Sequence, residues 1–309
     1  MRKQNREKIW VRIAGDPVRD KDEVLWTVVD ITERVKAKEK IDQLASKLSR
    51  YLSPQVYQSI FSGKKNVKIE AYRKKLTVFF SDIKGFTEIT DRLEPEVLST
   101  LLNSYLNEMS KIALKYGGTI DKFVGDAILI FFGDPETKGD KEDAYSCVLM
   151  ALEMQERMHH LKNLWEGQGI TNPLEIRIGI NTGYCNVGNF GSENRLDYTI
   201  IGGEVNLASR LESNAMTGQI LISQETYALI KKHIVCEKKA EIKVKGIAHK
   251  IQTYQVVGSY KNIAQKRKIL NEKFHGFNLN IDLNISKKNK VITSLENTLK
   301  QLKKDEKSN

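Results

Sequence analysis

One segment limits the possible folds more than any other: residues 127–132 read AILIFF and directly follow Gly125 and Asp126. Side chains alternate between the two faces of a sheet, so a strand of six apolar residues has no polar face to turn toward water. The stretch GTIDKFV precedes the Gly-Asp dipeptide, which has the length and chemistry of a two-residue hairpin turn. The sequence therefore predicts a hairpin within a sheet that is covered on both faces.

The middle of the chain alternates predicted strands with predicted helices. KLTVFF and EIRIGINTG are predicted strands, and helical periodicity runs through residues 89–118, 142–161 and 204–213. Helices mixed with hairpins favour an α+β fold, in which a mostly antiparallel sheet is sandwiched with helices. We expect helices on one side of this sheet and a second subunit on the other.

The N-terminal part divides into two regions. Residues 1–33 contain two alternating runs around a Gly-Asp-Pro turn, which is typical of a strand pair that needs a partner for stability. Residues 34–69 are a predicted helical linker, in which a short helix begins after Ser53 and ends at Gly63. Heptad spacing within this linker indicates a short coiled coil, with its apolar positions at Ile41, Leu44, Leu48 and Tyr51.

The rest of the chain forms a central domain, residues 70–258, and a basic extension, residues 259–309. In the extension GFNLNIDLNIS alternates as a strand does, and residues 291–302 have the pattern of an amphipathic helix. The final KKDEKSN is predicted to be disordered.

Composition narrows the class of protein. The net charge of +11 comes from the two ends, because residues 1–75 carry 19 Lys and Arg against 10 Asp and Glu, and residues 259–309 carry 12 against 5. A basic excess confined to the ends, without aromatic interleaving, argues against nucleic-acid binding. No apolar run has the length of a membrane span or a signal peptide, and the three cysteines form no paired motif. We therefore expect a cytoplasmic protein with reduced thiols and no membrane segment.

Two aspartates are candidate metal ligands. Asp82 ends the strand LTVFFSD, and Asp126 occupies the hairpin tip. A carboxylate beside apolar residues must stay hydrated or be paired with a positive charge. Carboxylates at strand ends suit Mg²⁺ when substrate phosphates complete its shell, and Gly85 in IKGFT would let backbone amides approach a phosphate. The alternative is two ordinary turn aspartates.

Five basic or amide side chains are further candidates, although each alone has a simple structural explanation. Lys122 is placed on the same strand face as Ile120 and Val124, where a lysine usually reaches into solvent. Asn206 and Arg210 are four residues apart and hence on one helix face. The last two candidates are Arg177, which alternates with isoleucines, and Lys245 in KVKG.

The joint order of five motifs is more specific than any of these residues alone. FFSDIKGFT, KFVGDA, RIGINTG, YTIIGGEVNLASRLE and VKG, in that order, resemble the catalytic domain of class III nucleotide cyclases, which convert ATP or GTP into the 3′,5′-cyclic monophosphate. The resemblance covers about residues 70 to 258. It implies an antiparallel sheet with helices, and a head-to-tail homodimer with active sites at the subunit interface.

The resemblance also implies roles for individual residues. Asp82 and Asp126 match the two carboxylates that hold two Mg²⁺ or Mn²⁺ ions per site, and the Ile83 carbonyl would add a ligand. Asn206 matches the residue that orients the ribose, and Arg210 the residue that stabilises charge on the α-phosphate. The phosphate or substrate contacts that it implies are Arg177, Lys245, Gly85, Phe86 and Thr87.

Lys122 and Thr199 match the base-reading pair of a bacterial subgroup. A lysine offers donors and no acceptor, so it suits N1 of adenine and opposes the N1–H of guanine. The Thr199 hydroxyl can accept from the adenine amino group but can also donate. We predict an adenylyl cyclase that acts on ATP, in which one subunit supplies Asp82 and Asp126. The other subunit supplies Lys122, Thr199, Asn206 and Arg210.

Two alternatives to an adenylyl cyclase stay open at this point. The chain could be a guanylyl cyclase, or a catalytically inactive module used for dimerisation or regulation.

Residues 28–38, VVDITERVKAK, resemble the exit of a PAS sensor domain and the signalling helix that follows it. We expect either a piece of a longer sensor protein or a chain that has lost its sensor.

Overall fold

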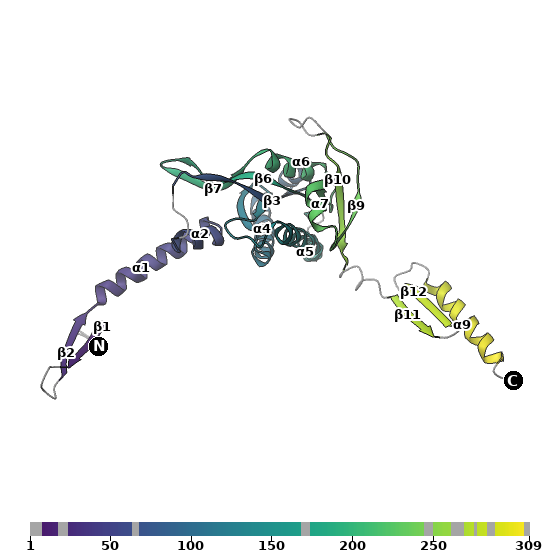
Figure 1. Cartoon of the computed structure of the whole chain (residues 1–309), viewed down its shortest axis with the longest axis horizontal. Coiled ribbons are helices and arrows are strands. Elements are labelled where there is room, and N and C mark those ends of the chain that lie inside the picture. Colours follow the sequence, from purple (N-terminus) through teal and green to yellow (C-terminus); the bar gives the residue numbers. More distant parts are fainter. Residues whose placement is uncertain are drawn as a thin grey trace.

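A computed structural model describes residues 8–17, 24–63, 68–167, 174–243, 250–260, 269–274, 277–282 and 288–305. At its centre lies an eight-stranded sheet in the order β4-β5-β3-β6-β8-β10-β9, with β7 paired to β6 (Figure 1). The strands are β3 (Ala71–Ile83), β4 (Thr119–Val124), β5 (Ala127–Phe132), β6 (Ile176–Ser192), β7 (Arg195–Ile201), β8 (Ile220–Ser223), β9 (Ile234–Lys238) and β10 (Thr253–Ser259). Only the pairing of β6 with β8 is parallel among these strands, so the predicted α+β fold with a mostly antiparallel sheet is confirmed.

The predicted hairpin is present as β4 and β5. Val124 pairs with Ala127 across a turn in which Gly125 has φ 64°, a left-handed conformation that glycine adopts without strain. The run AILIFF divides between two buried clusters on opposite faces of the sheet, one with Ile128, Ile130 and Phe132 and the other with Leu129 and Phe131. Both faces are therefore covered, as the apolar run requires.

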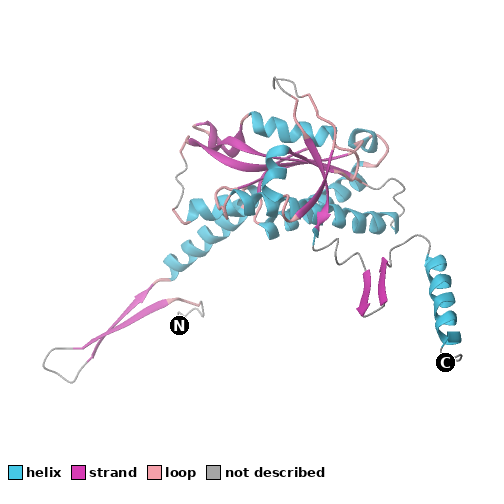
Figure 2. Ribbon diagram, turned by 45° about the vertical axis from the view of Figure 1, so that its right-hand side comes forward, coloured by secondary structure: helices cyan, strands magenta, loops and turns pink. Residues whose placement is uncertain are grey.

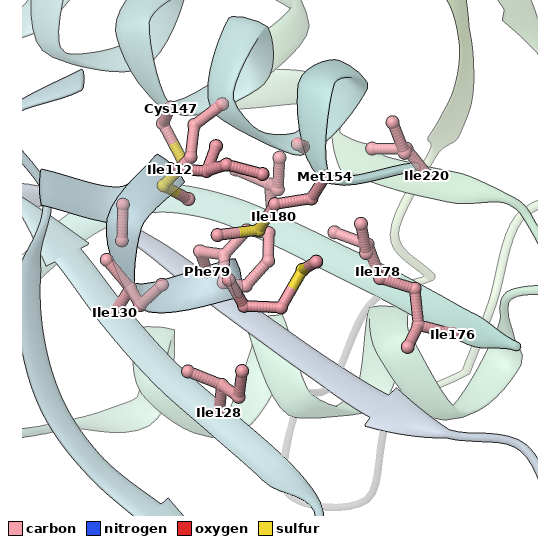
Figure 3. Close-up of a cluster of buried hydrophobic side chains, with 14 of the residues drawn as sticks. Phe79, Ile112, Ile128, Ile130, Cys147, Met154, Ile176, Ile178, Ile180 and Ile220 are labelled. Atoms are coloured by element: carbon pink, nitrogen blue, oxygen red, sulfur yellow. The ribbon is translucent and has the colours of Figure 1, made fainter. Parts of the chain in front are cut away.

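Three helices cover one face of the sheet. They are α4 (Pro95–Tyr116), α5 (Asp140–Gly167) and α7 (Gln224–Ile230). Figure 3 shows side chains of this core, where Phe79 and Ile130 of the sheet meet Met154 of α5. Replacement of water by this apolar packing is the main stabilising contribution to the domain.

The other face also carries a helix, contrary to our expectation that helices cover one side only. Helix α6 (Gly203–Asn214) packs there through Ala208, which is buried with Val78 and Val187. Its backbone approaches β6 closely: a Cβ added at Gly179 would lie 2.1 Å from the Glu212 amide nitrogen and 2.3 Å from the Ala208 carbonyl oxygen. Only glycine at position 179 permits this contact between helix and sheet.

A β-bulge changes the orientation of β4. Ile120 pairs with Ile130 and Lys122 pairs with Leu129, so Asp121 is an extra residue without a partner on β5. Ile130 and Leu129 face opposite sides of the sheet. Our placement of Lys122 on the same face as Ile120 is therefore wrong, because the bulge moves Lys122 to the face that bears α6.

The N-terminal strand pair and the long helix that follows it extend away from the central domain, whereas the second helix lies against it (Figures 1 and 2). The predicted strand pair is confirmed as β1 (Val11–Pro17) and β2 (Val24–Asp30), which leads into α1 (Thr32–Leu48) and a short 3-10 turn, η1 (Ser49–Tyr51). The predicted second helix is α2 (Pro54–Phe61), where the Ser53 hydroxyl accepts from the Val56 amide. Large apolar side chains of the strand pair, such as Trp26, are exposed.

The C-terminal elements lie at the opposite end of the molecule (Figure 1). Strands β11 (Ile269–Phe274) and β12 (Phe277–Asp282) pair with each other, and α9 (Lys288–Asp305) follows. The predicted strand and amphipathic helix are confirmed, but the helix also includes residues 303–305, which we expected to be disordered. Within the described parts of the chain, no helix combines the length and apolar character needed to cross a bilayer.

Candidate active site

Two carboxylates meet where β3 ends beside the β4–β5 hairpin. Asp82 is the penultimate residue of β3, and Asp126 forms the hairpin tip, where its Oδ2 accepts from the Ile83 amide at 3.0 Å. Partial burial raises the pKa of Asp126 to about 6, and the neighbouring Asp82 carboxyl adds to this rise through a hydrogen bond and its charge. The structure thus brings together the two residues predicted as metal ligands, and their mutual repulsion favours a cation between them.

This donor set fits a hard divalent cation. Mg²⁺ is commonly held by one or two carboxylates while water and substrate phosphates complete its shell. No group of three or more His, Cys, Asp or Glu side chains suited to a metal occurs among the described residues. Asp82 and Asp126, with the Ile83 carbonyl as a further oxygen donor, therefore suit an ion that arrives with its substrate.

Arg177 is held beside these carboxylates. Its Nη2 lies 3.1 Å from Asp82 Oδ2, and its Nη1 donates to the Ser213 carbonyl at 3.3 Å. The Nε atom is 2.6 Å from Glu212 Oε1, an ion pair whose angle is poor for a hydrogen bond. Every guanidinium nitrogen has a neighbour within the chain, so this placement favours a role in steadying Asp82 over the predicted phosphate contact.

The two predicted base-reading residues are joined through a third residue, Asp121. Thr199 on β7 donates to Asp121 Oδ2 at 2.5 Å, and the Lys122 ammonium lies 3.3 Å from Asp121 Oδ1. The Ile200 amide also donates to Asp121 Oδ2 at 3.3 Å. Lys122 and Thr199, far apart in sequence, therefore lie in one cluster within a single chain.

The remaining predicted pair lies on the outer side of α6. Asn206 and Arg210 are exposed, whereas Leu207 and Leu211 of the same helix are buried against the sheet. Neither exposed side chain makes a hydrogen bond or ion pair with any residue that the structure describes. Within one chain the structure does not join Asn206 and Arg210 to the two aspartates.

The loop after Asp82 combines an open turn with core packing. Gly85 has φ 69° and precedes the short helix α3 (Phe86–Thr90), and a Cβ there would meet only Glu88, at 3.9 Å. Phe86 is partly buried against the main core, and the Thr87 carbonyl accepts from the Thr90 hydroxyl. Lys245 lies outside the described residues.

Sequence reasoning missed two acidic residues, Asp121 and Glu212. For each of these two residues, the sequence contains a pattern that could have indicated its position. Asp121 and Lys122 place two charges in succession inside a strand, which breaks the alternation and is compatible with a bulge. Glu212 follows Leu207, Ala208 and Leu211 at helical spacing, so its position was on the buried face of α6.

Residues 67–258 match the family model for the adenylate and guanylate cyclase catalytic domain. A crystal structure of the adenylyl cyclase CyaB from P. aeruginosa is 64% identical, with a TM-score of 0.61, over 62% of this chain and 98% of that one. The guanylyl cyclase Cya2 is 37% identical, with a TM-score of 0.59, over 62% and 95% of the two chains.

Curated relatives are longer proteins. An adenylate cyclase of Dictyostelium discoideum, specific to terminal differentiation, is 33% identical over 72% of this chain and 10% of its own length. Adenylate cyclase 1 of Rhizobium meliloti is 32% identical over 61% of this chain and 28% of its own length. The chain thus spans under a third of each of these two relatives. Its central domain belongs to the family of adenylate and guanylate cyclase catalytic domains.

Proposed function

We propose that this chain is an adenylyl cyclase, which converts ATP into 3′,5′-cyclic AMP and pyrophosphate. The observation that carries the proposal is the cluster of Lys122 and Thr199 around Asp121, because it sets two base-reading groups side by side. The 64% identity to a bacterial adenylyl cyclase supports the same substrate.

The chemistry of the cluster suits adenine. Adenine presents an acceptor at N1 and an amino donor at C6, whereas guanine presents an N1–H donor and a carbonyl there. A lysine ammonium can only donate, so Lys122 would pair with adenine N1 and face the guanine N1–H unfavourably. A wrong base would leave a buried or partly buried polar group unpaired, which is how such sites discriminate.

The two carboxylates would bind the metal ions at the ribose 3′-hydroxyl and the triphosphate, the parts of the nucleotide that react. Class III cyclases use divalent metal ions, and we propose that Asp82, Asp126 and the Ile83 carbonyl hold two Mg²⁺ or Mn²⁺ ions. When bound, the ions would lower the pKa of the ribose 3′-hydroxyl and neutralise the triphosphate. Arg177 would keep Asp82 in place through the 3.1 Å contact. Gly85, Phe86 and Thr87 would line the triphosphate, with Lys245 as a further phosphate contact.

Asn206 and Arg210 would complete the site from a second copy of the chain. Both are exposed on α6 and unpaired by the described residues, so their side chains are available to a partner molecule. Asn206 would orient the ribose, and Arg210 would stabilise the charge that develops on the α-phosphate. Cyclase domains of this family function as dimers, and we propose a head-to-tail homodimer with two such sites.

An assay with both nucleotides and both metals tests the proposal. We expect purified protein to form cyclic AMP from ATP with Mg²⁺ or Mn²⁺, and to prefer ATP when GTP competes. A clear preference for GTP would instead make the chain a guanylyl cyclase, a function that the 37% identity to Cya2 keeps as the second candidate. Folded protein without product at saturating Mn²⁺ would identify an inactive regulatory module.

We also propose that the N-terminal segments carry regulation. Residues 1–33 would be the end of a PAS-like domain in a cytoplasmic sensor. Helix α1 exposes Ile41 and Leu44, which suits a short coiled coil between two copies. A rotation or register shift in that helix could then reach the dimer interface.

A further inference from the structure

The hydroxyl of Thr199 leaves a question about specificity, because a free hydroxyl can donate as well as accept. A threonine that donates would tolerate the guanine carbonyl, and one that accepts would favour the adenine amino group. The direction of its hydrogen bond therefore decides whether Thr199 contributes to the choice of base. In this structure the direction of the Thr199 hydrogen bond is set by Asp121, the residue that precedes Lys122 in the sequence.

Asp121 accepts the single hydrogen bond that the Thr199 hydroxyl can donate. Thr199 Oγ1 lies 2.5 Å from Asp121 Oδ2, and an ionised carboxylate can only accept. A hydroxyl that has donated its proton presents only lone pairs to other groups. Thr199 retains 6% of its surface, so any ligand that reaches it meets an acceptor.

The surroundings of Asp121 fit its ionised form. Its side chain is 1% exposed, and burial raises the pKa of this carboxyl above its ordinary value, although the contacts from Thr199, Lys122 and the Ile200 amide offset part of that rise. All three of these partners donate. The Lys122 ammonium and the Ile200 amide can only donate, and they face one carboxyl oxygen each, so a proton on either oxygen would meet a fixed donor and the cluster favours the carboxylate.

The β-bulge explains how the carboxylate reaches both base-reading residues. Regular alternation would send Asp121 and Lys122 to opposite faces of β4, whereas the extra residue lets Asp121 contact Lys122 and β7 together. A bulge interrupts the ladder, and a buried carboxylate is costly to desolvate. A purely structural link between β4 and β7 would not need a charge, because a neutral acceptor could take the hydrogen bonds from Thr199 and Ile200, whereas the charge also holds the Lys122 ammonium.

We propose that Asp121 is a specificity-determining positioning residue, which fixes Thr199 as a hydrogen-bond acceptor for the adenine amino group and holds Lys122 beside it. This inference rests on the proposed adenylyl cyclase activity and deepens it. Asp121 acts through Thr199 and need not touch the nucleotide. Its loss would free the Thr199 hydroxyl to donate, and GTP would then be rejected less well.

The test compares kcat/KM for ATP and for GTP in the full chain. Asp121→Ala should lower the ATP-to-GTP ratio by roughly 10-fold, the value of one directed hydrogen bond. Asp121→Asn is the matched control, because its amide oxygen can still accept from Thr199 and Ile200, and it should keep most of the ratio. Thr199→Val should also lower the ratio, and the double variant should be no worse than Asp121→Ala alone, because that change already removes the acceptor that orients the Thr199 hydroxyl.

A purely structural role for Asp121, as a link between β4 and β7, would give a different result. In that case Asp121→Ala would reduce kcat/KM equally for both nucleotides and leave their ratio unchanged, which would overturn the proposal. An additive double variant would also overturn it, because Asp121 would then not act through Thr199.

A measurement on the unmodified protein covers the case in which Asp121→Ala does not fold. Purine riboside triphosphate keeps the N1 acceptor of ATP but lacks the amino group. The wild-type protein should use it roughly 10-fold less well than ATP, because the Thr199 acceptor would lose its donor. Equal use of the two substrates would contradict an acceptor at position 199. A wild-type chain that prefers GTP or forms no cyclic nucleotide would overturn the proposed function itself, whereas an ATP-selective enzyme with an unchanged ratio in Asp121→Ala would overturn only the role of Asp121.

Discussion

Asp126→Asn is expected to lower kcat for cyclic AMP formation by at least about 1000-fold, equivalent to about 4 kcal/mol of transition-state stabilisation. The substitution removes a charge from the proposed metal site. It preserves shape, since an amide oxygen can still accept from the Ile83 amide as Asp126 Oδ2 does. Steady-state kinetics with saturating Mn²⁺ measure the effect. Activity within tenfold of the wild type would contradict a metal role for Asp126.

Stability separates this loss from misfolding. The pKa of Asp126 is raised in the folded protein, first by burial and then by Asp82, so its ionised form destabilises the metal-free fold at neutral pH. In EDTA the Asn variant should therefore unfold at a temperature no lower than the wild type. Asp42→Asn, which changes an exposed aspartate of α1, is the matched control and should change neither activity nor melting temperature.

Gly179→Ala is expected to destabilise the domain by about 3 kcal/mol and to remove most of its activity. The new methyl group would lie 2.1 Å from the backbone nitrogen of Glu212, and a backbone atom cannot move aside as a side-chain tip can. Helix α6 must therefore shift away from β6, and Asn206 and Arg210 shift with it. Urea unfolding and the cyclase assay measure the two effects.

The control for this change is a second glycine of the same region. A Cβ added at Gly203, the first residue of α6, would have no atom within 4 Å. Gly203→Ala should leave stability within about 1 kcal/mol of the wild type, or raise it slightly by stiffening the unfolded chain. If both alanine variants were equally stable, close contact between α6 and β6 would not position the helix.

Local signals were sufficient to predict much of the fold. AILIFF after Gly125 and Asp126 predicted a buried hairpin, because both the apolar run and the turn chemistry are properties of adjacent residues. Ser53 and Gly63 likewise marked the ends of α2. These features depend on neighbours within a few residues of each other along the chain.

The features that sequence reasoning missed depend on distant neighbours. The bulge at Asp121 reversed the predicted face of Lys122, and the carboxylate's partners, Thr199 and Ile200, lie on another strand. The ion pair of Arg177 with Glu212 joins β6 to α6. Periodicity placed Glu212 on the buried face of its helix, but no local pattern indicates which residue opposes it. Such contacts follow from tertiary packing and not from propensity.

Shared active sites between two chains are the central claim, and mixing two inactive variants tests it directly. An Asp126→Asn chain and an Arg210→Ala chain should each be inactive alone. A heterodimer of the two retains one site with Asp126 from one chain and Arg210 from the other. Statistical mixing therefore predicts recovery of about a quarter of wild-type activity, since half of the dimers carry one intact site of two. If verified heterodimers recovered no activity, the metal-binding aspartates and the α6 residues would not be contributed by different chains.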